Sequence, residues 1–427
     1  MPSLDQEYSA FSIDDLSIIF SVGEGEQQSF SIRGIMEKIE ITENIISPVI
    51  TGSVVVADTN VIARILKTGS TFLSFKMSKD EENFVYEKTM RIYKQEKRKL
   101  STQTSEKFIL YFCSEEMILS EQSKISRGYT ETYSKIAENI LIDFLGVSSE
   151  NMTISESIGV KKIAIPTLRP FDALFYCANR AVNTKNIPDF LFFENKEGFN
   201  FVSLETLYSE PAFSIFFTAK NTVVDEEGKQ SFFGAKHSEV SSQFNLLDSI
   251  KKGTYSSTIL GFDLITRTLF RQQVNNSYYD KKAKLNTETN LPTISNKKGV
   301  LASEAYDSKV MTLVTDSQYR RSQYAMKKDP TAKLHDPEIS LAHRNSVFSF
   351  ISAKRMKILL PGNFDLTVGM IVDLKYPKRG KIDNTEELDN SFSGKQLVIA
   401  VRHIIIPSKH ETIIEVASDS DMSADET

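Results

Sequence analysis

Short β-rich runs separated by turn residues fill both ends of this chain, and they constrain its fold more than any other feature. The first 116 residues contain seven runs rich in Val, Ile, Phe, Tyr and Thr, with Gly34 and Ser47-Pro48 among the turn residues between them. The run IMEKIEI at residues 35–41 alternates apolar and polar side chains, which is typical of a half-buried antiparallel strand. The runs are residues 16–22, 28–33, 35–41, 50–57, 72–77, 84–93 and 107–113. Strands at this spacing predict an antiparallel β-barrel or a sandwich over residues 1–116.

A second group of β-rich runs lies near the carboxyl end of the chain. Its five runs are residues 348–353, 354–360, 370–374, 396–403 and 411–416. With a strand candidate at 213–218 and a segment at 240–247 that fits a strand or the start of a helix, they predict a second barrel or sandwich. This domain is expected to combine residues 206–250 with 340–418. Residues 419–427 are acidic and polar, which predicts a flexible tail.

Two segments of different character separate the β-rich ends. Residues 129–145 carry apolar side chains at the spacing of an amphipathic helix, and Gly146 follows as a candidate C-cap. A second helix is predicted at 170–181 and a hairpin at 190–202, so residues 117–205 are expected to form a small α+β domain. Residues 251–339 begin with two strand-like pieces and continue as a polar stretch, which predicts a long insertion on the surface.

The composition excludes several classes of protein. Lys and Arg number 51 against 56 Asp and Glu, a net charge of −5, whereas nucleic-acid-binding proteins are usually strongly basic. Cys113 and Cys177 are too few for a disulfide framework or a four-ligand zinc site, and their aromatic neighbours indicate buried core residues. The first 20 residues lack the basic start of a signal peptide, and no apolar run approaches the roughly 18 residues of a membrane span. We therefore expect a protein without a membrane anchor that folds in a reducing cytoplasm.

Motifs of catalytic and nucleotide-binding sites are absent from the sequence. It contains no P-loop, no H-E-x-x-H and no G-x-S-x-G, and the glycines at 23 and 25 are two of the three that a dinucleotide fingerprint needs. The acidic pairs at residues 14–15, 81–82 and 386–387 fall in polar segments where nothing desolvates one carboxyl group. We interpret all three pairs as solvated loops.

The histidines and the basic run also have simple structural interpretations. His403 lies in an alternating strand and is expected to be a packing residue, while His335 and His343 lack partners at metal-ligand spacing. The run KQEKRK at residues 94–99 is interpreted as the solvated end of a hairpin. We predict no catalytic residue, no cofactor and no metal ion.

The order of several short segments carries a resemblance to a known family. Residues 39–58 (IEITENIISPVITGSVVVAD) contain a strand, an acidic turn, Ser-Pro, Gly-Ser and a β-branched strand that ends on Asp. GSTFLSF follows at residue 69, GTY at residue 253, GFDLIT at residue 261 and LPGNFDLTVG at residue 360. Together these segments resemble the baseplate hub protein of contractile-tailed bacteriophages, from about residue 10 to residue 418. The hub part of spike proteins in related injection machines is similar.

The resemblance implies a specific assembly. Hubs of this family are homotrimers in which each chain contributes two similar β-barrel tube domains, so that three chains form a ring with pseudo-sixfold symmetry. One face of the ring continues the hexameric tail tube and the other seats the trimeric spike, while DNA passes through the lumen without specific binding. The expected partners are two further copies of the chain, the tail tube protein, the central spike protein and baseplate wedge proteins. The expected location is the tail baseplate of a virion assembled in the bacterial cytoplasm.

Two other functions stay open. One is a tail-tip enzyme, a peptidoglycan hydrolase with acidic catalytic residues, and the other is a tail protein that binds a host glycan through Tyr278-Tyr279. For a structural hub without enzymatic activity, we expect assembly contacts or constrained backbone geometry at seven positions. They are Ser47, Pro48, Gly52, Gly69, Gly362, Gly369 and Gly394.

Overall fold

The computed structural model describes residues 11–22, 26–58, 62, 66, 70–79, 84–100, 106–216, 235, 237–264, 267–275, 284–287, 298–315, 337–376 and 388–422. In these ranges the chain is mainly β, as its sequence predicts. No helix within them is long and apolar enough to cross a membrane. The calls on Gly23 and Gly25, on the pairs 81–82 and 386–387, on His335 and on Tyr278-Tyr279 lie outside the described residues.

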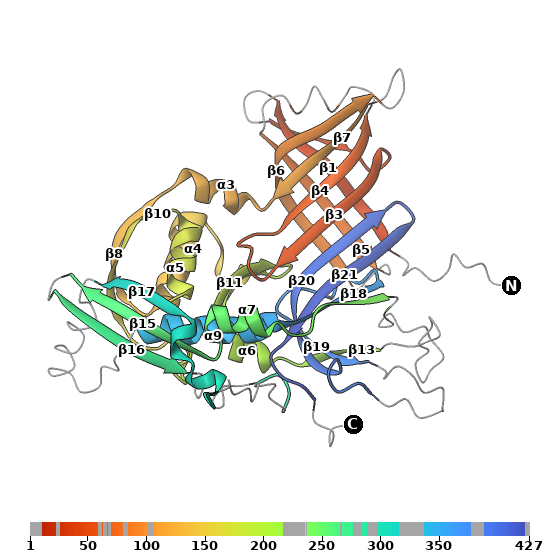
Figure 1. The fold of residues 1–427 in the computed structure, drawn as a ribbon. Helices are drawn as coiled ribbons and strands as arrows, with labels where there is room; N and C mark the ends of the chain where they lie inside the picture. Colours follow the sequence, from red (N-terminus) through yellow and green to blue (C-terminus); the bar gives the residue numbers. More distant parts are fainter. Residues whose placement is uncertain are drawn as a thin grey trace, which may run out of the picture.

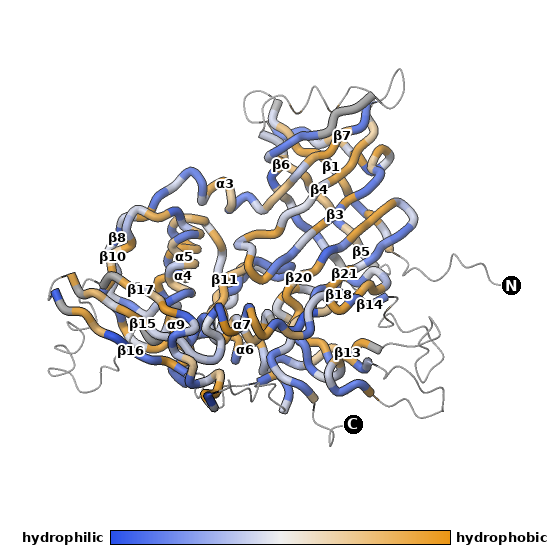
Figure 2. Tube along the Cα trace, in the orientation of Figure 1, coloured by the Kyte–Doolittle hydropathy of each residue, from blue (hydrophilic) through white to orange (hydrophobic). Residues whose placement is uncertain are grey.

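Seven strands make up the amino-terminal part, which we name the front module. They are β1 (Ser12–Val22), β2 (Glu26–Ser31), β3 (Met36–Asn44), β4 (Thr51–Asp58), β5 (Thr71–Lys79), β6 (Phe84–Leu100) and β7 (Glu106–Cys113). Each overlaps one of the seven predicted runs. Figure 1 shows these strands as a curved sheet at the top of the view, and Figure 2 shows apolar and polar residues alternating along them.

Six strands from the second half of the chain form what we name the back module. They are β13 (Ala212–Phe216), β14 (His237–Ser242), β18 (Lys354–Pro361), β19 (Ile371–Lys375), β20 (Gly394–Ile406) and β21 (Lys409–Ser418). Both modules belong to one 13-stranded sheet, because β3 of the front module pairs with β20 of the back module.

The two modules repeat the same strand order. The front module has the order β3-β4-β7-β6-β5-β1, and the back module has the order β14-β18-β21-β20-β19-β13. Taken in chain sequence, these strands correspond one to one, so the two sets are connected in the same way. The differences are that β1 pairs with β5 antiparallel whereas β13 pairs with β19 parallel, and that β2 has no counterpart among the described strands of the back module. Hydrogen-bonded closure of either module into a barrel is not seen among these strands.

The segment between the modules forms the predicted α+β unit. Its helices are α3 (Glu115–Gln122), α4 (Tyr133–Leu145), η3 (Ser149–Asn151), α5 (Pro170–Ala178) and α6 (Leu204–Tyr208), and its strands are β8 (Ile125–Glu131), β9 (Met152–Ile154), β10 (Lys161–Leu168), β11 (Phe190–Asn195) and β12 (Gly198–Ser203). The expected C-cap of α4 is confirmed, since Gly146 has a φ of 68° and its N–H bonds back to the last turn. The β11–β12 hairpin is confirmed as well.

Residues between β14 and β18 are more ordered than the sequence predicts. They contain α7 (Leu246–Lys252), β15 (Ser256–Asp263), β16 (Thr268–Asn275), η5 (Ala302–Glu304), η6 (Tyr306–Ser308), β17 (Val310–Thr315) and α9 (Pro337–Ala353). The three strands form a separate sheet in the order β16-β15-β17, and Ile259 and Val274 pack with Ala342 of α9. The expectation of a polar stretch with little structure after residue 274 is therefore wrong for β17 and α9.

Other local predictions also need correction. Residues 348–353 were expected to be a strand but form the end of α9, where Val347, Phe350 and Ile351 are buried at helical spacing. A six-residue run with apolar side chains at four positions fits a strand or a helix, and the burial pattern of the longer segment shows that it is helical. Residues 14–15 lie within β1 at a bulge, not in a loop. Residues 94–99 belong to β6 near its turn with β7, and Lys94 is exposed, which agrees with the predicted solvated end of a hairpin.

A candidate assembly site where the two modules join

Main-chain pairing connects the two modules directly. Strands β3 and β20 are antiparallel, with a register that runs from Asn44 opposite Ala400 to Ile39 opposite Ile405. An ion pair between Glu40 and Arg402 crosses this contact. Burial favours the neutral form of Glu40, but hydrogen bonds from Lys38 and Arg402 hold the pKa of its carboxyl group below the ordinary value. We name this contact between β3 and β20 the module joint.

A buried carboxylate lies at the end of the module joint. Glu43, on β3, is fully buried and accepts three hydrogen bonds. Its donors are the Tyr86 hydroxyl at 3.2 Å, the Thr367 hydroxyl at 2.5 Å and the Val368 N–H at 3.2 Å. Burial raises the pKa of Glu43 although these hydrogen bonds act in the opposite direction. Because Tyr86 belongs to the front module and Thr367 and Val368 precede β19, Glu43 links the two modules through side chains as well.

Aromatic and histidine rings fill the space beside Glu43. Phe364 stacks on the ring of His410 with a centroid distance of 4.2 Å and also contacts Tyr86 and His403. His403 Nδ1 lies 3.1 Å from the Thr412 hydroxyl, and burial lowers the pKa of His403 to about 3. The predicted packing role of His403 therefore agrees with a neutral, fully buried ring.

A second buried carboxylate attaches the α+β unit to the front module. Glu194, on β11, accepts hydrogen bonds from the Ile50 N–H at 2.8 Å and from the Ser114 hydroxyl, and it forms an ion pair of 3.1 Å with Lys88. The same hairpin also reaches the back module, since Lys196 donates through its Nζ to the carbonyl of Phe364 at 3.3 Å. Three parts of the chain thus meet around the module joint.

The chemistry of this site fits fixed geometry better than catalysis. Both carboxylates are surrounded by donors from different parts of the chain, so each holds several segments in place. Burial raises the pKa of Cys113 to about 11 and that of Cys177 to about 12, which keeps both thiols protonated at neutral pH, and the expectation that they are core residues is confirmed. In the described part of the chain, no three His, Cys, Asp or Glu residues are placed to hold a metal ion.

Three of the glycines singled out from the sequence lie close to the module joint. A Cβ at Gly52 would overlap the ring of Phe112, and one at Gly362 would overlap the ring of His410. Gly369 has a φ of 93°, and a Cβ there would lie 2.9 Å from Cζ of Phe193. Gly362 and Phe364 are buried within the chain. The predicted assembly contact of Gly362 stays a prediction.

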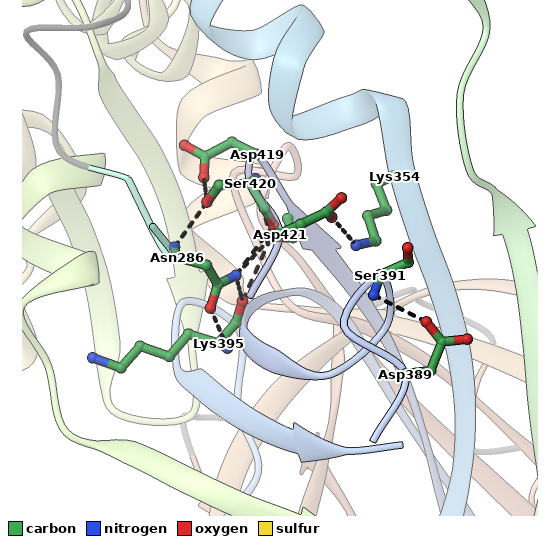
Figure 3. A network of polar contacts seen from close by, with 9 residues as sticks. Asn286, Lys354, Asp389, Ser391, Lys395, Asp419, Ser420 and Asp421 are labelled. Atoms are coloured by element: carbon green, nitrogen blue, oxygen red, sulfur yellow. Dashed lines mark hydrogen bonds and ion pairs between the residues drawn. The ribbon is translucent and has the colours of Figure 1, made fainter. Parts of the chain in front are cut away.

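Gly394, at the start of β20, meets a segment from the insertion. Its φ is 92°, and a Cβ would lie 2.6 Å from Oδ1 of Asn286. Figure 3 shows Asn286 between Lys395 and Ser420. The Asn286 side chain accepts from the Lys395 N–H at 2.8 Å and donates to the carbonyls of Lys395 and Ser420 at 3.0 and 3.2 Å. Ion pairing of Lys354 with Asp421 at 2.6 Å also holds residues of the expected flexible tail.

Ser47 and Pro48 lie in the turn between β3 and β4. The Ser47 hydroxyl donates to the carbonyl of Val49 at 2.8 Å, and the neighbouring Ile46 is 75% exposed. Gly69 lies outside the described residues. The structure leaves the predicted assembly contacts of Ser47 and Pro48 as predictions.

Glu43 and Glu194 were not predicted from the sequence. Each is a charged residue in or next to a β-rich run, and a single acidic side chain there normally faces solvent. The alternation at residues 35–41 does give a signal, because Glu43 has the same parity as Ile39 and Ile41, which are buried. An acidic residue on the apolar face of a strand was therefore the feature to notice.

Comparison with known proteins places this fold among phage tail proteins. No protein-family description matches the chain. A probable baseplate hub protein, gp334 of Vibrio phage KVP40, is 23% identical over 350 residues, which cover 81% of this chain and 79% of that protein. The resemblance to phage baseplate hub proteins is confirmed.

Solved structures show the same fold over nearly the whole chain. The tail protein from Neisseria meningitidis MC58 matches with a TM-score of 0.52 at 11% identity, over 96% of this chain and 97% of that one. The 43 kDa tail protein of prophage MuSo2 from Shewanella oneidensis matches with a TM-score of 0.51 at 10% identity, over 94% and 98%. Similarity to hub and tail proteins thus extends across both modules and the α+β unit.

Proposed function

We propose that this chain is the structural hub of a contractile phage tail baseplate and that three copies form a ring. The observation that carries the proposal is the repeated strand order of the front and back modules, joined by β3 and β20 within one chain. A chain with two such modules lets three copies present six similar units around an axis. Each module then serves as a tube domain of the barrel type.

Such a ring adapts one symmetry to another. Its six modules match a hexameric tail tube on one face, and its three chains match a trimeric central spike on the other. Baseplate wedge proteins are the expected partners at the periphery, where the α+β unit and the β15–β17 sheet lie away from the front module in Figure 1. With a net charge of −5 the chain offers no general electrostatic attraction for DNA, which suits a channel that DNA passes through.

The mass of the purified protein in solution tests the proposal. Three chains of 48.2 kDa give a particle of about 145 kDa, which light scattering or native mass spectrometry distinguishes from smaller species. A stable monomer at micromolar concentration would contradict a permanent ring, because such interfaces are large and apolar. Incubation with purified peptidoglycan tests the hydrolase alternative. Release of soluble fragments would support the enzyme and contradict a purely structural hub.

A further inference from the structure

Strand β20 extends beyond the end of its neighbour β21. The pairing of the two strands ends at Leu397, which lies opposite Ala417. In the same register Lys395 would lie opposite Asp419, but β21 ends at Ser418. On the other edge, this part of β20 pairs with β19. The main chain of Lys395 therefore lacks the partner that a longer β21 would have supplied.

The side chain of Asn286 takes the place of this missing strand residue. Its Oδ1 accepts from the Lys395 N–H at 2.8 Å, and its Nδ2 donates to the Lys395 carbonyl at 3.0 Å. Two residues that form a hydrogen-bonded pair in antiparallel strands exchange the same two kinds of bond. Figure 3 shows the Asn286 amide beside the main chain of Lys395. Asn286 thus satisfies a piece of sheet edge with a side chain instead of a strand.

Asn286 belongs to a short segment of the insertion, residues 284–287, which we name the strap. The strap lies in the connection between β16 and η5 and outside the described helices and strands. Leu285 is its buried residue, with an exposed fraction of 6%, and it packs in the core of the back module. The strap therefore fastens the insertion to the back module in addition to the contacts of α9.

Residues that follow β21 hold the strap in place. The Leu285 N–H donates to Oδ1 of Asp419 at 3.1 Å, and the Asn286 N–H donates to the Ser420 hydroxyl at 2.8 Å. Asn286 Nδ2 also donates to the Ser420 carbonyl at 3.2 Å. The strap is thus connected to the end of β21 and to the start of β20 at the same time.

The residues after β21 are themselves anchored to other elements. Oδ2 of Asp419 accepts from the Tyr208 hydroxyl of α6 at 3.2 Å, and Asp419 is buried. Asp421 forms an ion pair of 2.6 Å with Lys354, the first residue of β18, and both side chains are largely buried. These anchors fix residues 419–421 to α6 and β18, so the strap is the part of this contact that is free to move.

We propose that the strap opens and closes locally on the back module, with residues 419–421 as its fixed fastening. Besides the burial of Leu285, Leu285 and Asn286 are held by hydrogen bonds that involve side chains. Segments with few buried apolar contacts open at a lower free energy than core strands do. Opening exposes the N–H and C=O of Lys395 as a sheet edge to which an extended chain can pair, and closing covers that edge. This device belongs to the single chain and is independent of the proposed ring.

Hydrogen exchange of the full chain, resolved to single amides by mass spectrometry with fragmentation, tests the opening. After correction for intrinsic rates, the amides of Leu285, Asn286 and Lys395 should exchange at least tenfold faster than those of Val401 and Ile414. The latter two residues lie opposite each other in the β20–β21 pair. Equal protection at the two places would overturn the proposal, because the strap would then open only when the module unfolds.

Two variants test the hydrogen bonds that close the strap. Asn286→Ala removes both bonds to Lys395 and should accelerate exchange at Lys395 at least tenfold, with no change at Val401. The matched variant Asn139→Ala, which removes a side-chain hydrogen bond within the α+β unit, should leave Lys395 unchanged. Ser420→Ala should accelerate exchange at Asn286 at least tenfold. An unchanged rate at Lys395 in Asn286→Ala, or equal acceleration at Val401, would contradict the proposal, and the wild-type rates decide it even where a variant fails to fold.

Discussion

Substitution of Glu43 by alanine should strongly destabilise the chain, because Glu43 holds three buried donors at the module joint. The Val368 N–H is fixed by the backbone, and leaving such a group unsatisfied costs about 1–3 kcal/mol. The hydroxyls of Tyr86 and Thr367 can rotate, but they also lose their acceptor and border a new cavity. Together these terms predict a loss of about 3–5 kcal/mol in the free energy of unfolding.

Glu43→Gln is the matched control. Its amide oxygen can still accept from Val368 and Thr367, and its amide nitrogen can donate to the Tyr86 hydroxyl, so the loss should stay within about 1 kcal/mol. Urea unfolding followed by circular dichroism, at equal protein concentration for all variants, measures both values. A loss below about 1 kcal/mol for alanine, or equal losses for alanine and glutamine, would refute the hydrogen-bonding explanation.

Three further changes probe the rest of the site. Glu194→Leu removes the acceptor of the Ile50 N–H, so hydrogen exchange at the Ile50 amide should accelerate at least tenfold. An unchanged exchange rate would show that this hydrogen bond does not protect the Ile50 amide. In the folded chain His403 stays neutral, whereas in the unfolded chain its pKa is about 6.5, so the unfolded chain binds a proton first as the pH falls. The free energy of unfolding should therefore decrease between pH 7 and pH 5, by up to about 1.4 kcal/mol per pH unit. The decrease should be smaller in His403→Gln. Gly369→Val should cost about 2–4 kcal/mol in urea unfolding, because valine disfavours a φ of 93° and its Cβ would approach Phe193; a wild-type midpoint would be the contrary result.

Local elements of this fold could be predicted because their signals are local. Alternation along residues 35–41 gave β3, and the helical spacing with Gly146 gave α4 and its end. The prediction for residues 348–353 failed because a six-residue run of four apolar residues and two serines fits both a strand and the end of α9. The two strand-like pieces predicted at the start of residues 251–339 correspond to β15 and β16, whereas β17 and α9 lie in the polar stretch, where apolar periodicity gave no signal.

The site itself depends on contacts that no local pattern contains. The pairing of Ile39 with Ile405 joins residues far apart in sequence, and nothing in either run names its partner. A buried Glu43 is recognisable only when the donors from Tyr86 and Val368 are known to surround it. The need for glycine at position 362 likewise comes from a His410 ring that arrives from another strand.

An electron cryomicroscopy reconstruction of the isolated protein tests most directly whether three chains with two similar modules each form a ring of six similar units. We expect a closed ring of three chains in which front and back modules alternate around a central opening. A ring in which each chain contributes one unit to the central wall, or particles of a single chain, would contradict this arrangement.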